Sequence, residues 1–389
     1  MSRRSAPTSP RPRLRAHVSA PGAARWCDGP VRVLRRLVSV PLVLGLTVLL
    51  WTTLPLWVLV AAAASPFLPG RWRAPRGLWM VVVYLTMEAV LLAILLGLWM
   101  ASGFGRRLRT AYFEGIHYDL VQGVMAVLFS EARRVLHLEV VSQGSVPDAH
   151  PGVPILVCCR HAGPGDSFTL IHTLMAWYSR EPRVVLKATL AWDPVIDTLL
   201  HRIPARFITP GRGVDLEAEI AALATGLDEN DAFVIFPEGG NFTQARRHRA
   251  IERLDQLGLH GMARRAEEMV HVLAPRPGGL LAALDAAPEA DVVLVAHTGL
   301  DHVVTMRELW RAIPIDKQIT MKWWQVPRSE IPADREERID WLYGWWERID
   351  AWVEQHRVVV GGRVAPEPTG GDGAVDDERP EEPRSSGRR

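Results

Sequence analysis

The sequence predicts an α/β domain with a mostly parallel sheet flanked by helices, preceded by a two-helix membrane hairpin. Two observations predict this fold. The first is a pair of long apolar runs near the N-terminus, Leu37 to Leu68 and Leu78 to Phe104. The second is a series of short β-rich runs that alternate with helical stretches along the rest of the chain. Near-continuous apolar strands separated by helices are typical of parallel sheets covered on both faces.

The composition excludes several classes of protein. The 389 residues include 45 Lys and Arg against 43 Asp and Glu, so the chain lacks the strong positive charge of a nucleic-acid binder. The three cysteines, Cys27, Cys158 and Cys159, are too few for a disulfide scaffold and lack the paired spacing of zinc sites. We therefore expect neither a nucleic-acid partner nor a metal site.

Both ends of the chain are expected to be disordered. Residues 1–36 form a basic arm with nine arginines against one acidic residue, Asp28, and with many Pro, Ser and Ala residues. The tail, residues 363–389, is rich in Gly, Pro and acidic residues. Segments of this kind cannot bury enough apolar surface to offset the entropy of ordering them.

The two apolar runs predict a membrane hairpin over residues 37–104. The first run has no charged residue, and about 20 apolar residues are enough to cross a bilayer. Core helices of a soluble domain are the alternative, which the length of the runs disfavours. Glu88, the only charge in the second run, is costly in lipid. It is therefore a candidate functional residue, although a protonated Glu88 hydrogen-bonded to the partner helix is the favoured interpretation.

The flanking charges predict the orientation of this hairpin. Arginines precede the first run and also follow the second, so both ends should lie on the cytoplasmic side of the cytoplasmic membrane, with residues 105 onward facing the cytoplasm. Arginines in the connector between the runs weaken this rule. They leave open a hairpin that dips into one leaflet without crossing; these residues are Arg71, Arg73 and Arg76.

Residues 105–362 are expected to form the α/β domain. Its last helix carries several tryptophans, which suit either the membrane interface or packing against the sheet. The expected strands are 153–159, 183–190, 205–211, 232–239 and 291–299, and the expected helices are 167–178, 215–227, 246–268 and 335–353.

A histidine and an aspartate follow the first of these strands. His161 is separated from Asp166 by a turn that contains Gly163, Pro164 and Gly165. Such a turn can fold the carboxylate back onto the imidazole, where it would fix the tautomer and stabilise the imidazolium. A loop histidine followed by a helix N-cap is the alternative. The spacing alone favours this alternative, because such a pair is expected by chance about once in a chain this long.

A second motif changes that balance. The strand 232–236 runs into Pro237, Glu238, Gly239 and Gly240, and ligands bind at the carboxyl ends of strands in open α/β sheets. Glycines allow the backbone to approach a substrate, and arginines on the following helix can hold a phosphate through paired hydrogen bonds. For any single arginine there, a solvated helix face is the better interpretation.

Together, His-x4-Asp after one strand and Phe-Pro-Glu-Gly after another resemble the glycerolipid acyltransferases, the family that includes the lysophosphatidic acid acyltransferases. The resemblance spans about 153–335 and carries the motifs in the family's order. Its first motif is 161–166, its second is suggested by Lys187, Trp192, Pro194 and 206–208, its third is 236–239, and 272–276, 292–299 and 326–332 resemble later blocks.

The chain departs from the family pattern at two places. Gly240 and Asn241 stand where the family has Thr-Arg, and the arginine that ends the second motif is replaced by Thr209 and Pro210. Phosphate recognition is therefore expected to fall to other arginines. The candidates are Arg212, Arg246, Arg247 and Arg276.

The resemblance implies acyl transfer from acyl-CoA or an acyl carrier protein to the hydroxyl of a lysophospholipid, converting lysophosphatidic acid into phosphatidic acid. His161 would be the general base and Asp166 its partner, while Glu238 and the Gly239 backbone would position the acceptor and the oxyanion. Lys187 would belong to the substrate-binding set. No cofactor or acyl-enzyme is implied, so the two adjacent cysteines are expected to be packing groups.

Three alternatives remain on the sequence. The acceptor could be another lysophospholipid. A lipid hydrolase would use the same polar residues, but the chain lacks the Gly-x-Ser-x-Gly turn that carries its nucleophile. A non-catalytic lysolipid-binding membrane protein is favoured only by the altered Gly240 and Asn241.

Overall fold

The computed structural model describes residues 29–357, with gaps at Arg71, 145–151, Pro164, 209–215 and 302–305. The first 28 residues of the expected basic arm and all of the expected tail lie outside the described residues. The first helix, α1 (Gly29–Ala64), begins ahead of the uncharged run that starts at Leu37.

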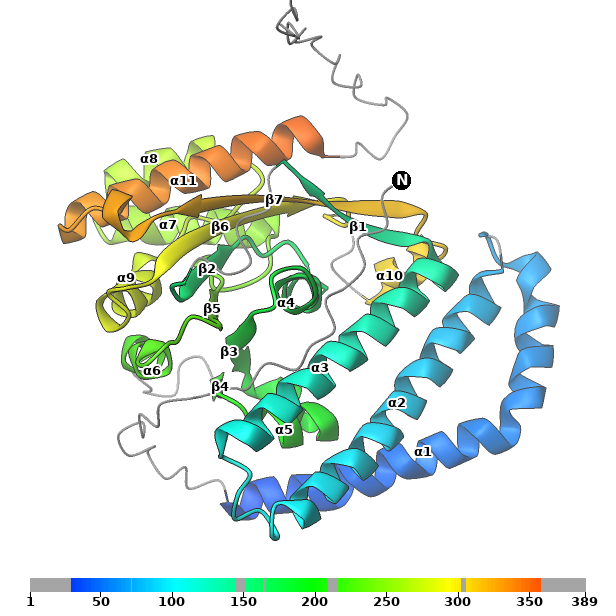
Figure 1. The fold of residues 1–389 in the computed structure, drawn as a ribbon. Helices are drawn as coiled ribbons and strands as arrows, with labels where there is room; N and C mark the ends of the chain where they lie inside the picture. Colours follow the sequence, from blue (N-terminus) through cyan, green and yellow to red (C-terminus); the bar gives the residue numbers. More distant parts are fainter. Residues whose placement is uncertain are drawn as a thin grey trace, which may run out of the picture. The chain divides into compact units, whose positions relative to one another are not determined.

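A seven-stranded sheet lies at the centre of the fold, in the order β1-β7-β6-β2-β5-β3-β4 (Figure 1). Five neighbouring strands of this sheet run parallel to one another: β6, β2, β5, β3 and β4. They comprise β2 (Ile155–Cys159), β3 (Glu181–Lys187), β4 (Ala205–Ile208), β5 (Asp231–Ile235) and β6 (Asp291–Thr298). The predicted α/β class with a mostly parallel sheet is therefore confirmed.

Two strands were not expected. β7 (Lys317–Val326) pairs antiparallel with β6 and parallel with β1 (Leu138–Gln143), so the sheet ends in two reversed strands. In β7 the buried residues Ile319, Met321 and Trp323 alternate with more exposed ones. This period-2 alternation differs from the continuous apolar runs of the parallel strands.

Helices cover both faces of the sheet. Leu156 and Cys158 of β2 pack with α6 (Leu216–Ala224) and α9 (Pro277–Ala286). Ile155, Val157 and Cys159 face the opposite way, toward α4 (Asp166–Trp177). Both cysteines are fully buried, and burial raises the pKa of both thiols, as expected of packing groups.

The last helix, α11 (Arg335–His356), packs on the first of these faces. Leu342, Trp346 and Ile349 are completely buried in the cluster that contains α6 and α9. The indole of Trp352 is also buried and donates a hydrogen bond to Gln143 of β1 at 2.9 Å. The structure thus favours packing against the sheet as the role of this tryptophan-rich helix.

The expected helix 246–268 is two helices. α7 (Gln244–Gln256) and α8 (His260–Glu268) are separated by a turn at Gly258, whose φ of 75° lies in the left-handed region. A glycine adopts this conformation without a steric penalty, so it ends α7 and allows the chain to turn back.

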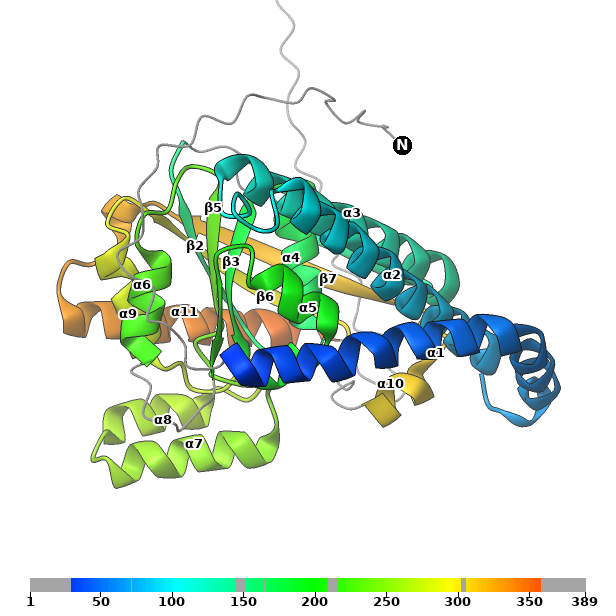
Figure 2. The same cartoon turned by 90° about the horizontal axis from the view of Figure 1, so that it is seen from below.

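The other side of the sheet carries a succession of helices. The pairs α4–α3, α3–α2 and α2–α1 pack in turn outward from it (Figures 1 and 2). The elements not yet given are α2 (Arg73–Ala101), α3 (Ala111–Glu131), α5 (Pro194–Leu200) and α10 (Met306–Ala312), with the short helices η1 (Ser65–Phe67), η2 (Ala132–Leu136), η3 (Ala188–Trp192) and η4 (Arg328–Glu330).

The two N-terminal helices pack side by side. Thr47 Oγ1 donates to the Leu85 carbonyl at 3.1 Å, and Trp51 Nε1 donates to Thr86 Oγ1 at 3.0 Å. α1 contains two prolines and bends along its length (Figure 1). Both helices are long and apolar enough to cross a membrane, judged by length and composition.

The amino end of α1 is attached to the α/β domain. Arg35 and Arg36 both form ion pairs with Asp197 of α5, whose side chain is fully buried. Breaking a buried ion pair is costly, so this contact fixes the start of α1 against α5.

Candidate active site

The predicted site residues meet where three adjacent parallel strands end. His161 follows β2 and Glu238 follows β5, and β2 lies between β5 and β6 with all three strands parallel. The backbone N–H of His161 donates to Glu238 Oε1 at 3.3 Å, and the Phe242 N–H donates to the His161 carbonyl at 2.6 Å. The two motifs are therefore in direct contact at the edge where open α/β sheets bind ligands.

His161 and Asp166 form a hydrogen-bonded pair. Nδ1 of His161 lies 3.2 Å from Oδ2 of Asp166, and the same oxygen accepts the Gly163 N–H at 2.6 Å. Asp166 is the first residue of α4, whose N-cap is Gly165, so it does not act as the N-cap. A carboxylate at Nδ1 holds the proton on that nitrogen and leaves Nε2 as the basic atom of the ring.

A second histidine, not singled out from the sequence, joins this pair. Nε2 of His297, near the end of β6, lies 3.6 Å from Asp166 Oδ2 and 3.2 Å from the Arg160 carbonyl. Burial opposes ionisation of Asp166. The charge of His297 and the hydrogen bonds from His161 and Gly163 outweigh it, so the pKa of Asp166 lies below its ordinary value. Asp166 is thus a carboxylate at neutral pH.

Arg160 connects the ends of β2 and β6 beneath this pair. Its side chain is 2% exposed, its Nη1 donates to the His297 carbonyl at 2.6 Å, and its Nη2 lies 2.7 Å from Asp301 Oδ1. Burial of Asp301 is outweighed by the Arg160 charge, so the pKa of Asp301 is held well below its ordinary value. Neither member of this ion pair was predicted, since the sequence gives no sign that they meet.

Glu238 is enclosed by the protein and is 2% exposed. Burial raises the pKa of Glu238 to about 8, although the nearby Arg160 charge favours the ionised form. At neutral pH the side chain is therefore mostly a neutral acid. It accepts the backbone N–H of His161 and so holds the backbone at that residue rather than facing solvent.

This pKa predicts a pH-dependent stability. Between about pH 4.5 and pH 8 the folded chain holds a proton on Glu238 that the unfolded chain has released. The free energy of unfolding should therefore fall as pH rises, by up to about 1.4 kcal/mol per pH unit in that window. Glu238→Gln removes this contribution, so thermal unfolding in detergent should show the variant gaining stability relative to wild type from about pH 5 to pH 8.

The exposed Glu139 of β1 provides a matched control, Glu139→Gln, which should follow the wild-type pH profile. Parallel profiles for wild type and Glu238→Gln would contradict the raised pKa of Glu238.

Gly239 does not provide the expected oxyanion donor. Its backbone N–H donates to the Phe236 carbonyl at 3.0 Å, which closes the turn after β5. Its φ of 69° requires a glycine, and a Cβ there would lie 3.2 Å from the guanidinium carbon of Arg276. Because Gly239 has no side chain, the guanidinium of Arg276 can lie directly against this turn.

The other predicted substrate-binding residues differ in position. Arg246 lies beside the same turn, with Nη1 donating to the Asn241 carbonyl at 2.9 Å. Arg247 points away, because its guanidinium donates to carbonyls at the end of α8, including Met269 at 2.6 Å. Lys187 is exposed at the end of β3, and Arg212 lies outside the described residues.

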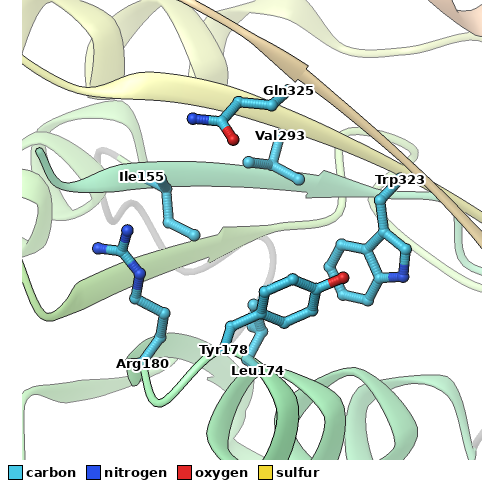
Figure 3. Close-up of a pocket in the computed structure, with 7 residues that line it drawn as sticks. All are labelled: Ile155, Leu174, Tyr178, Arg180, Val293, Trp323 and Gln325. Atoms are coloured by element: carbon cyan, nitrogen blue, oxygen red, sulfur yellow. The ribbon is translucent and has the colours of Figure 1, made fainter. Parts of the chain in front are cut away.

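An apolar cavity of about 360 Å³ lies next to α4. It is lined by residues of α2, α3, η3 and α5, and Phe168, two positions after Asp166, forms part of its wall. Its volume is in the range of small-molecule pockets, about 300–1,000 Å³. A much smaller cavity of about 10 Å³ lies toward the amino ends of β2 and β6, between Tyr178, Arg180 and Trp323 (Figure 3). It has room for a single water at most.

Part of the chain is similar to known acyltransferases. A family model described as Acyltransferase matches residues 137–298. The uncharacterized acyltransferase C428.14 of Schizosaccharomyces pombe is 23% identical over 186 residues, covering 44% of this chain and 50% of the relative. The chain thus matches about half the length of this curated relative.

Among solved structures, the 1-acyl-sn-glycerophosphate (LPA) acyltransferase PlsC from Thermotoga maritima is similar, with a TM-score of 0.47 and 13% identity. The likeness covers 72% of this chain and 98% of that one. The matched segment 137–298 contains β2, β5 and β6 with His161, Asp166 and Glu238. Residues 137–298, about two fifths of the chain, are therefore similar to the acyltransferase family.

Proposed function

We propose that this protein transfers a fatty acyl group from acyl-CoA or acyl carrier protein to the free hydroxyl of a lysophospholipid, converting lysophosphatidic acid into phosphatidic acid. In this proposal residues 105–362 are the catalytic domain. The hairpin holds it at the cytoplasmic membrane, facing the cytoplasm, where the lysolipid acceptor and the diacyl product reside.

The pairing of His161 with Asp166 is the observation that carries the proposal. A carboxylate 3.2 Å from Nδ1 leaves Nε2 free to take a proton and stabilises the imidazolium that results. Both residues are mostly buried yet lie at the ligand-binding edge of the sheet, with side-chain exposures of 16% and 10%. A base of this kind contributes about 10²–10⁴-fold to a reaction rate.

The reaction follows from this arrangement. Nε2 of His161 removes the proton from the acceptor hydroxyl as its oxygen attacks the thioester carbonyl, giving a tetrahedral oxyanion. Collapse of that intermediate breaks the C–S bond, and the leaving thiolate takes the proton back from the imidazolium. The products are an oxygen ester and a free thiol, and no side chain of the protein is acylated.

Two further features support the identity of the substrates. The apolar cavity beside Phe168 has the lining that a fatty acyl chain requires. Arg246 and Arg276 flank the turn after β5, and guanidinium groups bind phosphate through paired charged hydrogen bonds. Exposed Lys187 adds a third positive charge at the carboxyl ends of the strands.

Product analysis tests the proposal. Purified full-length protein in detergent is incubated with radiolabelled acyl-CoA and lysophosphatidic acid, and the lipids are separated. We expect labelled phosphatidic acid together with release of free CoA thiol. Labelled free fatty acid would identify a hydrolase instead, and an unchanged donor would identify a lysolipid-binding protein.

A head-group panel then tests the acceptor. Because a phosphate monoester carries more negative charge than a phosphodiester, the arginines predict faster transfer to lysophosphatidic acid than to lysophosphatidylcholine or lysophosphatidylethanolamine. Equal rates would leave acyl transfer standing and overturn the assignment of the acceptor.

A further inference from the structure

The cavity next to α4 is apolar along most of its length but polar at one place. Leucines, valines and methionines of α2 and α3 make up much of its wall. Besides Thr189 of η3, three polar side chains line this cavity, two of them on α2 and one at the start of α5. They are Tyr84, Glu88 and Asp193.

Two of these side chains satisfy each other. The Tyr84 hydroxyl donates to Asp193 Oδ2 at 2.5 Å, and Asp193 Oδ1 accepts the Ile196 N–H at 2.8 Å as the N-cap of α5. The hydroxyl proton of Tyr84 is therefore already donated, and each carboxylate oxygen of Asp193 already accepts a hydrogen bond. What Tyr84 still offers to the cavity is an acceptor lone pair.

Glu88 is the third side chain, and its hydrogen bonding is incomplete among the described residues. It is 6% exposed and accepts a hydrogen bond from the Val195 backbone amide at the start of α5. Its Oε2 is buried and has no hydrogen-bond partner among residues 29–357 that the structure describes. Glu88 thus turns toward α5 and the cavity, and the expected bond to the partner helix α1 is not what the structure contains.

The unpaired Oε2 of Glu88 indicates which kind of ligand group would bind there. A buried polar atom without a partner costs free energy that a suitable ligand group recovers. A plain hydrocarbon chain in the cavity would leave Oε2 unpaired and remove any water from it. A hydroxyl group on the chain would pair with Oε2 in either protonation state, because a hydroxyl both donates and accepts.

We propose that this cavity binds an aliphatic chain that carries a hydroxyl group, which hydrogen-bonds to Glu88 Oε2. The inference rests on the proposed function in treating the occupant as a substrate chain. That chain belongs either to the acyl donor or to the lysolipid acceptor, and the hydroxyl is the chemistry that both sources share.

Direct binding provides the first test and does not depend on turnover. Binding of stearate and of a set of monohydroxystearates to the full-length protein is measured in detergent by titration calorimetry. We expect at least one positional isomer to bind about tenfold or more tightly than stearate, because its hydroxyl satisfies Glu88 Oε2, which stearate leaves unpaired.

Glu88→Met is the decisive variant, since it removes the carboxylate and keeps an unbranched side chain of similar length. It should bind stearate and hydroxystearates equally. Glu139→Met makes the same change at an exposed position of β1, away from the cavity, and should retain the wild-type preference. Equal binding by wild type, or a preference that survives Glu88→Met, overturns the proposal.

Competition assays then identify the source of the chain. Wild type is given equal amounts of plain and hydroxylated acyl-CoA with one acceptor, and separately plain and hydroxylated lysolipid with one donor. A preference in the first assay places the donor chain in the cavity, and a preference in the second places the acceptor chain there. If the protein does not transfer acyl groups, these two competition assays cannot be carried out. The binding result still tests the cavity.

Discussion

Replacement of His161 by alanine is expected to abolish acyl transfer while leaving the fold intact. The variant lacks the imidazole that we propose as the general base, which pairs with the Asp166 carboxylate, so the rate should fall about 10²–10⁴-fold. The two backbone hydrogen bonds of residue 161, to Glu238 and from Phe242, do not involve the imidazole. Thermal unfolding of the variant should therefore stay close to that of wild type. The measurement is the rate of phosphatidic acid formation at saturating substrate.

His260→Ala is the matched control for this experiment. The His260 side chain is 73% exposed on α8 and also lies 3.2 Å from an aspartate, Asp255. It therefore repeats the loss of a carboxylate-paired imidazole outside the site, and its activity should equal that of wild type. Wild-type rates in His161→Ala would exclude His161 as the general base.

Part of the site could be predicted because it depends on the common direction of two neighbouring strands. His161 and Glu238 are far apart in sequence, but each follows a buried apolar strand. Since the carboxyl ends of parallel strands share one edge of the sheet, the two motifs had to approach each other if those strands were neighbours. The pairing of β2 with β5 meets that condition.

His297 and Arg160 required knowledge of the strand order. His297 reaches Asp166 because β6 lies directly beside β2, and Arg160 binds the His297 carbonyl for the same reason. A strand-to-strand register of this kind is a non-local property, and no local pattern in the sequence encodes it. The only available signal was a histidine near the carboxyl end of an expected strand.

Side-chain direction limited the prediction of the arginines. Arg246 and Arg247 are adjacent on α7, and neighbouring helical residues point in different directions. One reaches the turn after β5 and the other binds the carbonyls that end α8. Because the break at Gly258 turns α8 back beside α7, the second of these contacts could not be foreseen from a continuous helix 246–268.

Arg160→Met is expected to destabilise the fold more than any change made in the site itself. The variant leaves Asp301 without its cation and removes hydrogen bonds to the carbonyls of His297 and His271. Removal of one partner from a buried ion pair costs about 3–5 kcal/mol. Asp301 is 32% exposed and can be partly rehydrated, so we expect the lower end of that range, about 3 kcal/mol. Urea unfolding in detergent provides the measurement.

Arg249→Met is the matched control, since Arg249 is exposed on α7 and donates to the carbonyl of Ala245 in its own helix. Surface changes of this kind are usually within about 0.5 kcal/mol of wild type. A similar small effect in Arg160→Met would contradict the buried ion pair. A large effect would link the residue directly before His161 to the stability of the sheet edge. Arg160 holds the His297 carbonyl, and the ring of His297 lies beside Asp166, so the packing of β2 against β6 would then hold the His161–Asp166 pair together.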